Sequence, residues 1–143
     1  MNLIIVSLLV GVLSQTAKFI FRLFGKRKKN LKGALWVYEW AGGAPSTHSA
    51  VLVAAIYTIA YYEGYGLLFG FAVVVAAVFI YNLLAERTKE ELEEANLKKR
   101  GPRWASKIYD DGRLLDISGH TFFEVISGII FGLVMAFVLN KVF

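Results

Sequence analysis

The sequence predicts an all-α integral membrane protein, a bundle of four transmembrane helices with a charged cytoplasmic segment between helices three and four. Hydrophobic residues make up 57% of its 143 residues and the mean hydropathy is +0.54, whereas soluble domains average about 45–50% apolar residues. The apolar residues gather in four runs that polar segments separate. The chain has no cysteine, which excludes disulfides and thiolate metal sites. Its length fits a single domain, residues 1–143.

The first two apolar runs lie in the N-terminal half. Residues 3–24 form the first run, interrupted by Gln15 and Lys18, and the basic stretch 26–32 follows it. A short amphipathic piece then supplies interface aromatics, namely Trp36, Tyr38 and Trp40. The second run, about residues 46–62, is somewhat short of the roughly 20 residues that a membrane span needs.

The last two runs flank a long polar segment. Glu63-Gly64 marks a turn, and residues 67–84 form the third run. The chain is then charged to about residue 113, and within this segment residues 87–100 have the composition of an exposed helix that Gly101-Pro102 ends. Residues 125–138 open the fourth run.

The basic residues predict the orientation of the bundle in the cell membrane. Cytoplasmic loops carry the excess of Lys and Arg, so we interpret the net charge of +5 as topology and expect no nucleic-acid partner. The charges lie between runs one and two (residues 26–32) and between runs three and four, at Arg87, Lys89, Lys98, Lys99, Arg100, Arg103, Lys107 and Arg113. Both termini should therefore lie outside, and helices two and four should start at the cytoplasmic face. His48 and His120, the two histidines of the chain, then lie on the same face.

The stretch before the second run has the composition of an anion site. A helix N-terminus offers unpaired N–H groups and a positive dipole end. Here Gly43 allows close backbone approach, Ser46 or Thr47 can cap the helix, and His48 can deliver a proton. The alternative is that Ser46 and Thr47 are ordinary caps and that His48 is an interfacial histidine.

The stretch before the fourth run pairs an imidazole with a carboxylate. Glu124 follows His120 by four residues, which on a helix is the same face one turn along. Such a carboxylate can fix the tautomer and leave the other ring nitrogen basic. An acidic group in a membrane helix is costly and is usually paired or functional, which favours a site over an isolated interfacial histidine.

Three cationic side chains are candidates for binding a phosphate. Lys18 either extends to the interface from helix one or contacts the phosphate. Arg87 follows helix three and is either a topology charge or a head-group ligand. Arg113 lies seven residues before His120 in an irregular segment, so its position is not predicted.

The two polar stretches resemble a divergent branch of the type 2 phosphatidic acid phosphatase superfamily, a branch of small membrane proteins related to acid phosphatases and vanadium haloperoxidases. Residues 42–50 are similar to Gly-Gly-Met-Pro-Ser-Ser-His-Ser-Ala, with Ala44 and Thr47 as changes. Residues 119–125 are similar to Gly-His-Thr-Pro-x-Glu-Val, with Phe122 in place of proline.

The resemblance extends along nearly the whole chain but omits the usual arginines. Gln15 and Lys18 match a Gln-x-x-Lys pattern in helix one, and Arg87 matches an arginine after helix three. The Lys-x6-Arg-Pro motif of the wider superfamily is absent, and Leu114 stands where the last motif has its arginine.

The resemblance implies a reaction and a role for each residue. His120 would attack phosphorus and form a phosphohistidine, His48 would protonate the leaving alcohol, and Glu124 would orient His120. Ser46 would hold a phosphate oxygen. Neither a metal nor a cofactor is required.

These observations lead to one main hypothesis and two alternatives. The main hypothesis is a metal-independent phosphatase that acts on a prenyl or glycerolipid phosphate among the membrane lipids. The first alternative is a non-catalytic membrane protein that binds anionic head groups or protein partners through the same pocket, which the missing arginines favour. The second is a lipid phosphotransferase. A homodimer remains open for a bundle of this size.

Overall fold

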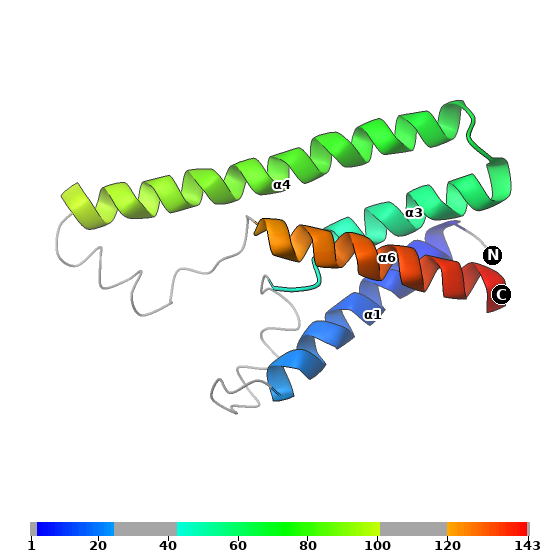
Figure 1. The fold of residues 1–143 in the computed structure, drawn as a ribbon, viewed down its shortest axis with the longest axis horizontal. Coiled ribbons are helices and arrows are strands. Elements are labelled where there is room, and N and C mark those ends of the chain that lie inside the picture. Colours follow the sequence, from blue (N-terminus) through cyan, green and yellow to red (C-terminus); the bar gives the residue numbers. More distant parts are fainter. Residues whose placement is uncertain (1–2, 25–42, 101–119, 143) are drawn as a thin grey trace.

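The described part of the chain is entirely helical. The computed structural model describes residues 3–24, 43–100 and 120–142. Within these ranges the regular elements are α1 (Leu3–Phe24), α3 (Thr47–Glu63), α4 (Leu67–Arg100) and α6 (Phe122–Val142), and no strand is present (Figure 1). The all-α prediction is therefore confirmed. The aromatic piece near Trp36 and the segment that contains Arg113 lie outside the described residues.

Three of these helices could cross a membrane. The apolar windows are Leu3–Phe21 in α1, Leu67–Lys89 in α4 and Phe122–Val142 in α6. The remaining helix, α3, has 17 residues and thus a length of about 26 Å, slightly short of the roughly 30 Å hydrocarbon layer. A fourth span stays a prediction.

The third apolar run and the charged segment after it form one continuous helix. α4 covers 34 residues, which corresponds to about 51 Å. No glycine or proline separates the apolar run from the Glu/Lys-rich segment, and the junction Leu84-Ala85-Glu86-Arg87 consists of good helix formers. The helix therefore continues beyond its apolar window.

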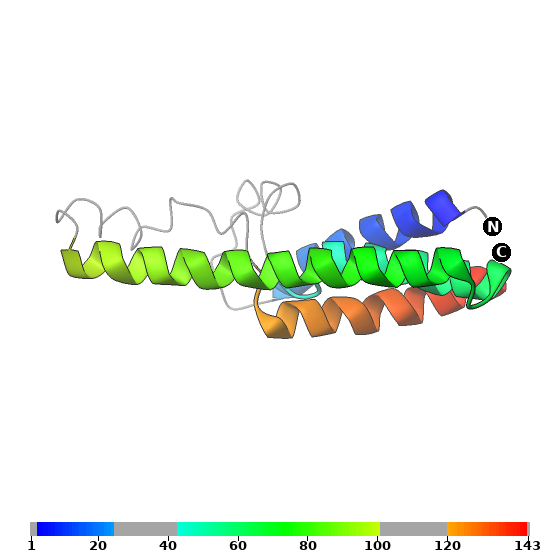
Figure 2. The same cartoon turned by 90° about the horizontal axis from the view of Figure 1, so that it is seen from above.

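The helix α3 is the centre of the bundle, because α1, α4 and α6 each pack against it. The two chain ends and the α3–α4 turn lie at one end of the molecule (Figure 1). At that turn Gly64 takes a positive φ of 76° and its N–H bonds the Ala60 carbonyl, as expected for a glycine that ends a helix. The N-termini of α3 and α6 both lie toward the opposite end, and α4 runs past them (Figures 1 and 2).

The contact between α3 and α6 is a seam of small residues. A Cβ at Gly132 would overlap the Ala50 carbonyl, and a Cβ at Gly128 would overlap the Ser46 carbonyl. Ala50, Ala54 and Ala136 are fully buried along the same seam. Small residues at four-residue spacing allow helix backbones to approach closely in a membrane, where dispersion contacts replace the hydrophobic effect as the driving force.

A buried hydrogen bond joins α3 and α6 toward their C-terminal ends. Asn140 Nδ2 donates to Thr58 Oγ1 at 3.0 Å and to the Ala136 carbonyl at 2.8 Å. Both side chains are almost fully buried, Asn140 at 4% exposed and Thr58 at 2%. Since polar groups in lipid need internal partners, this pair fixes the register of α3 against α6.

Candidate functional site

Ser46 caps the N-terminus of α3. Its backbone is extended (φ −64°, ψ 117°), and its Oγ accepts bonds from the Ser49 N–H at 3.4 Å and from the Ser49 hydroxyl at 3.2 Å. The side chain is fully buried. Ser46 is therefore the cap of the two candidates, and Thr47 is the first residue of the helix.

A capping box starts α6. The Thr121 N–H donates to Glu124 Oε2 at 2.9 Å, and the Glu124 N–H donates to Thr121 Oγ1 at 3.3 Å. This reciprocal pair is typical of Thr-x-x-Glu at a helix start. This capping box was not predicted, although Thr-x-x-Glu directly before an apolar run is its sequence signature.

The capping box, not a shared helix face, brings Glu124 to His120. α6 begins at Phe122, so His120 lies before the helix and the predicted one-turn spacing does not apply. Glu124 instead turns back toward the N-terminus to meet the Thr121 N–H, and in that position its Oε2 lies 3.4 Å from His120 Nδ1. The predicted pair is present, for a different physical reason.

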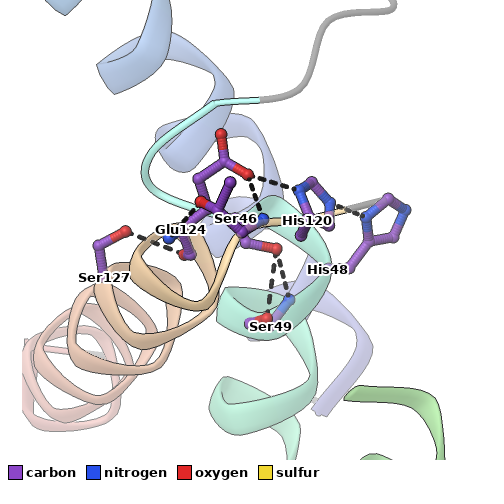
Figure 3. Close-up of polar contacts among 7 residues, drawn as sticks. Ser46, His48, Ser49, His120, Glu124 and Ser127 are labelled. Carbon is purple, nitrogen blue, oxygen red and sulfur yellow. Dashed lines mark hydrogen bonds and ion pairs between the residues drawn. The ribbon is translucent and has the colours of Figure 1, made fainter. Parts of the chain in front are cut away.

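The two histidines are in direct contact. His48 Nδ1 lies 3.2 Å from His120 Nε2, with the ring centroids 5.5 Å apart and the planes inclined by 54°. Figure 3 shows Glu124, His120 and His48 in a line, each side chain pointing toward the next. His120 is buried (6% exposed), whereas His48 is exposed.

Backbone contacts hold the two stretches together. The Ser46 N–H donates to the Glu124 carbonyl at 3.0 Å, and the Ser127 hydroxyl donates to the same carbonyl at 2.9 Å. The His120 N–H donates to the Leu83 carbonyl of α4 at 3.2 Å. Gly128 makes the first contact sterically possible, because its missing Cβ leaves room for Ser46.

The structure describes two of the three cationic candidates, Lys18 and Arg87. Lys18 is buried at 5% exposed and lies near enough to His48 for their charges to interact. Arg87 is half-buried and follows Leu83 by one helical turn, so it lies on the face of α4 that meets His120. Arg113 lies outside the described residues.

The remaining candidates, Thr47 and Gly43, lie at the start of α3 and in the stretch before it. Thr47 is half-buried, and its Oγ1 hydrogen-bonds the Ser14 hydroxyl of α1 at 2.9 Å. Gly43 is half-buried and takes a positive φ of 137°, a conformation that glycine adopts readily. On the side of α4, the Phe79 ring lies 6.2 Å from the His48 ring, measured between centroids. Within the described ranges no cluster of three or more His, Cys, Asp or Glu side chains could hold a metal ion.

Comparison with known proteins identifies a family. Residues 1–135 match the family model described as "Divergent PAP2 family", which confirms the resemblance inferred from the two polar stretches. No curated protein and no solved structure matches the chain.

Proposed function

Because the chain belongs to the Divergent PAP2 family, we propose that it is a membrane phosphatase that hydrolyses a prenyl or glycerolipid phosphate through a phosphohistidine. The observation that carries the proposal is the line from Glu124 through His120 to His48, with contacts of 3.4 Å and 3.2 Å. The site combines an oriented imidazole that can act as nucleophile, a second imidazole that can act as acid and base, and two helix N-termini. Together these groups suit phosphoryl transfer without a metal.

In the first step His120 is the nucleophile. Its Nδ1 faces the Glu124 carboxylate, which holds the proton on that atom and leaves the lone pair on Nε2. Nε2 attacks phosphorus, the N–P bond forms and the bond from phosphorus to the lipid oxygen breaks. His48 starts as the imidazolium, with a hydrogen on each ring nitrogen. Its Nδ1, the atom that faces Nε2, gives its proton to the departing lipid oxygen, and His48 is left as the neutral imidazole.

In the second step water replaces His120. The water oxygen attacks phosphorus, His48 Nδ1 accepts a proton from that water, and the N–P bond breaks to release inorganic phosphate. Both imidazoles thereby return to their starting protonation. The same nitrogen of His48 acts first as acid and then as base, as microscopic reversibility expects.

Cationic and backbone groups would hold the phosphate. Lys18 on α1 lies near His48, and Arg87 on α4 lies one helical turn after Leu83, whose carbonyl accepts the His120 N–H. The first turn of α3 adds N–H groups and a positive dipole end. The Thr47 hydroxyl is half-buried and can contact a phosphate oxygen. Ser46, whose Oγ already accepts two bonds from Ser49, contributes by capping this helix end.

The membrane placement is part of the proposal. We propose that α3 is the fourth span and that the site faces the cytoplasm, with both termini outside. The exposed apolar side chains of α4, among them Phe71 at 66% and Val74 at 62% exposed, fit a surface covered by lipid. The site at the mouths of α3 and α6 then lies at head-group level, where a lipid phosphate resides.

A phosphate-release assay tests the function. Purified protein is incubated with prenyl phosphates and phosphatidic acid, and released phosphate is measured for the native chain, His120→Ala and His48→Ala. We expect His120→Ala to lose a factor of at least about 10³, because no nucleophile remains, and His48→Ala about 10²–10⁴. Gly70→Ala is the control, since no atom lies within 4 Å of a Cβ there. Release that persists equally in both histidine variants rejects the site.

One observation favours a non-catalytic role for the same pocket. Lys18 and Arg87 are the two cationic candidates that the structure describes, and the usual superfamily arginines are absent from the sequence. Cationic clamps supply much of the stabilisation of a phosphoryl transition state. Binding of a lipid phosphate with no release would identify a head-group-binding protein. Release that appears only with an added alcohol acceptor would identify a phosphotransferase.

A further inference from the structure

The contact between the two imidazoles occupies the atoms that the proposed reaction uses. His48 Nδ1 and His120 Nε2 are 3.2 Å apart, so one nitrogen donates a hydrogen bond and the other accepts it. A nucleophile must approach phosphorus to about 3–3.5 Å before attack. A phosphoryl group therefore does not fit between the two nitrogens in this arrangement.

The neighbours of His120 decide which nitrogen holds the shared proton. Glu124 Oε2 accepts the Thr121 N–H, so this oxygen is an acceptor and the facing Nδ1 of His120 carries a hydrogen. With Nδ1 protonated, Nε2 of a neutral His120 has only its lone pair. The bond between the rings is then His48 Nδ1–H to His120 Nε2, and the donor masks the nucleophile.

We propose that this shared proton closes the site, and that a non-reacting oxyanion, such as sulfate or the released phosphate, opens it by displacing the His48 ring with uptake of one proton. This inference rests on the phosphate site proposed above and adds its regulation. Entry of the anion and the proton balance of the histidine pair are thereby coupled.

His48 is the ring that moves. His120 is held by its backbone bond to Leu83, by the contact with Glu124 and by its burial at 6% exposed. His48 is exposed and lies in the first turn of α3. A rotation of its side chain separates the rings while both helices keep their packing.

Counting donors gives the proton stoichiometry. Sulfate carries no proton at neutral pH and offers only acceptors, so both inward nitrogens must donate to it, whereas the closed pair holds one proton between them. Among the described residues, Lys18 on α1 and Glu124 on α6 interact with the pair, and Arg87 lies on α4 one helical turn after Leu83, whose carbonyl accepts the His120 N–H. Between pH 5 and 8 histidine is the side chain that ordinarily titrates. Sulfate affinity should therefore fall as pH rises, by up to about tenfold per pH unit.

The same count of hydrogen-bond donors predicts that pH affects the binding of product and of substrate differently. Inorganic phosphate can take hydrogen bonds from both protonated nitrogens, whereas a reacting ester needs Nε2 of His120 without a proton. Acidic conditions should therefore strengthen retention of the product more than binding of the reactive ester.

The chain offers a direct spectroscopic test, because His48 and His120 are its two histidines. Protein labelled with ¹⁵N in histidine alone gives ring signals from these two side chains, and His48→Ala assigns them. Without added anion we expect a protonated His48 Nδ1, an unprotonated His120 Nε2 and a scalar coupling between them across the hydrogen bond. Sulfate should remove the coupling and protonate Nε2.

Calorimetry in buffers of different ionisation enthalpy measures the proton uptake. We expect the uptake of a single proton for each sulfate bound near neutral pH. If sulfate shifts both rings but the coupling persists, or if it binds with no proton uptake, the closure proposal is overturned and the phosphatase proposal stands. If neither sulfate, inorganic phosphate nor a lipid phosphate shifts either ring, both proposals are overturned.

Discussion

At the scale of single residues, Glu124 performs two tasks with one oxygen. Oε2 accepts the Thr121 N–H at 2.9 Å and faces His120 Nδ1 at 3.4 Å. The first contact starts α6 and the second orients the imidazole. Helix capping and the orientation of the proposed nucleophile therefore depend on the same carboxylate.

Two substitutions of Glu124 should separate these tasks. In Glu124→Gln the amide oxygen can still accept the Thr121 N–H, as glutamine does in capping boxes, so we expect stability within about 0.5 kcal/mol of the native chain. The negative charge opposite His120 is lost, and phosphate release should fall by roughly 10²–10⁴-fold. Thermal unfolding in detergent and the phosphate-release assay measure the two effects.

The alanine variant is the matched comparison. Glu124→Ala also removes the acceptor of the Thr121 N–H, which is one of the two bonds of the capping box, and losing this hydrogen bond should cost about 1 kcal/mol of stability in addition to the same loss of activity. Equal activity in Glu124→Gln and the native chain would remove Glu124 from the proposed mechanism.

The contact between His48 and His120 was predictable from the sequence only in part. Helix starts and charge counting predicted that His48 and His120 lie on the same membrane face. Their direct hydrogen bond did not follow, because it depends on Ser46 bonding the Glu124 carbonyl, a contact between segments distant in the chain that no local pattern encodes.

At the scale of elements, the apolar runs predicted the existence of the helices but not their packed faces. In a soluble helix the polar face identifies the outside, whereas in lipid both faces are apolar. The four-residue spacing of Gly128, Gly132 and Ala136 indicates a packed face, but it was not used to predict one. In the structure these residues form the seam against α3.

Gly128→Ala should weaken the molecule at this seam. The new Cβ would overlap the Ser46 carbonyl and lie 3.0 Å from the Ser46 nitrogen, so the N-terminus of α3 must move away from α6. We expect the free energy of unfolding to fall by about 1–3 kcal/mol, as for other overpacked sites, measured by thermal unfolding in detergent. The ring coupling between His48 and His120 should weaken in the same variant.

Gly70→Ala is the control for this substitution. Gly70 lies within α4, and no atom is within 4 Å of a Cβ built on it. The change removes a flexible glycine from a helix, so it should leave stability unchanged or raise it by up to about 1 kcal/mol. A Gly128→Ala protein as stable as the native chain, with its ring coupling intact, would contradict the steric argument.

At the scale of the whole molecule, the exposed tyrosines and the histidine pair lie toward opposite ends of the helices. The α3–α4 turn and both chain ends lie at one end, and the starts of α3 and α6 lie toward the other (Figure 1). The exposed aromatics Tyr61, Tyr62 and Tyr65 lie near the turn. Interfacial tyrosines are expected where helices leave the hydrocarbon, so this end fits one membrane surface and the histidine pair fits the other.

Single cysteines should reveal which surface each end faces. The chain contains no cysteine, so each introduced thiol is the sole target of a membrane-impermeant maleimide. In the sequence, the basic stretches lie between α1 and α3 and between the apolar run of α4 and α6, on the chain segments that lead to the two histidines, and the positive-inside rule assigns them to the cytoplasm. We therefore expect Glu63→Cys, exposed beside the α3–α4 turn, to label from outside intact cells. Lys89→Cys, exposed at the last residue of the apolar window of α4, should label only after permeabilisation. The reverse pattern would place the histidine pair on the outer surface and restrict its substrates to lipid phosphates of the outer leaflet. Labelling of both thiols in intact cells would contradict a span between them and with it the four-span bundle.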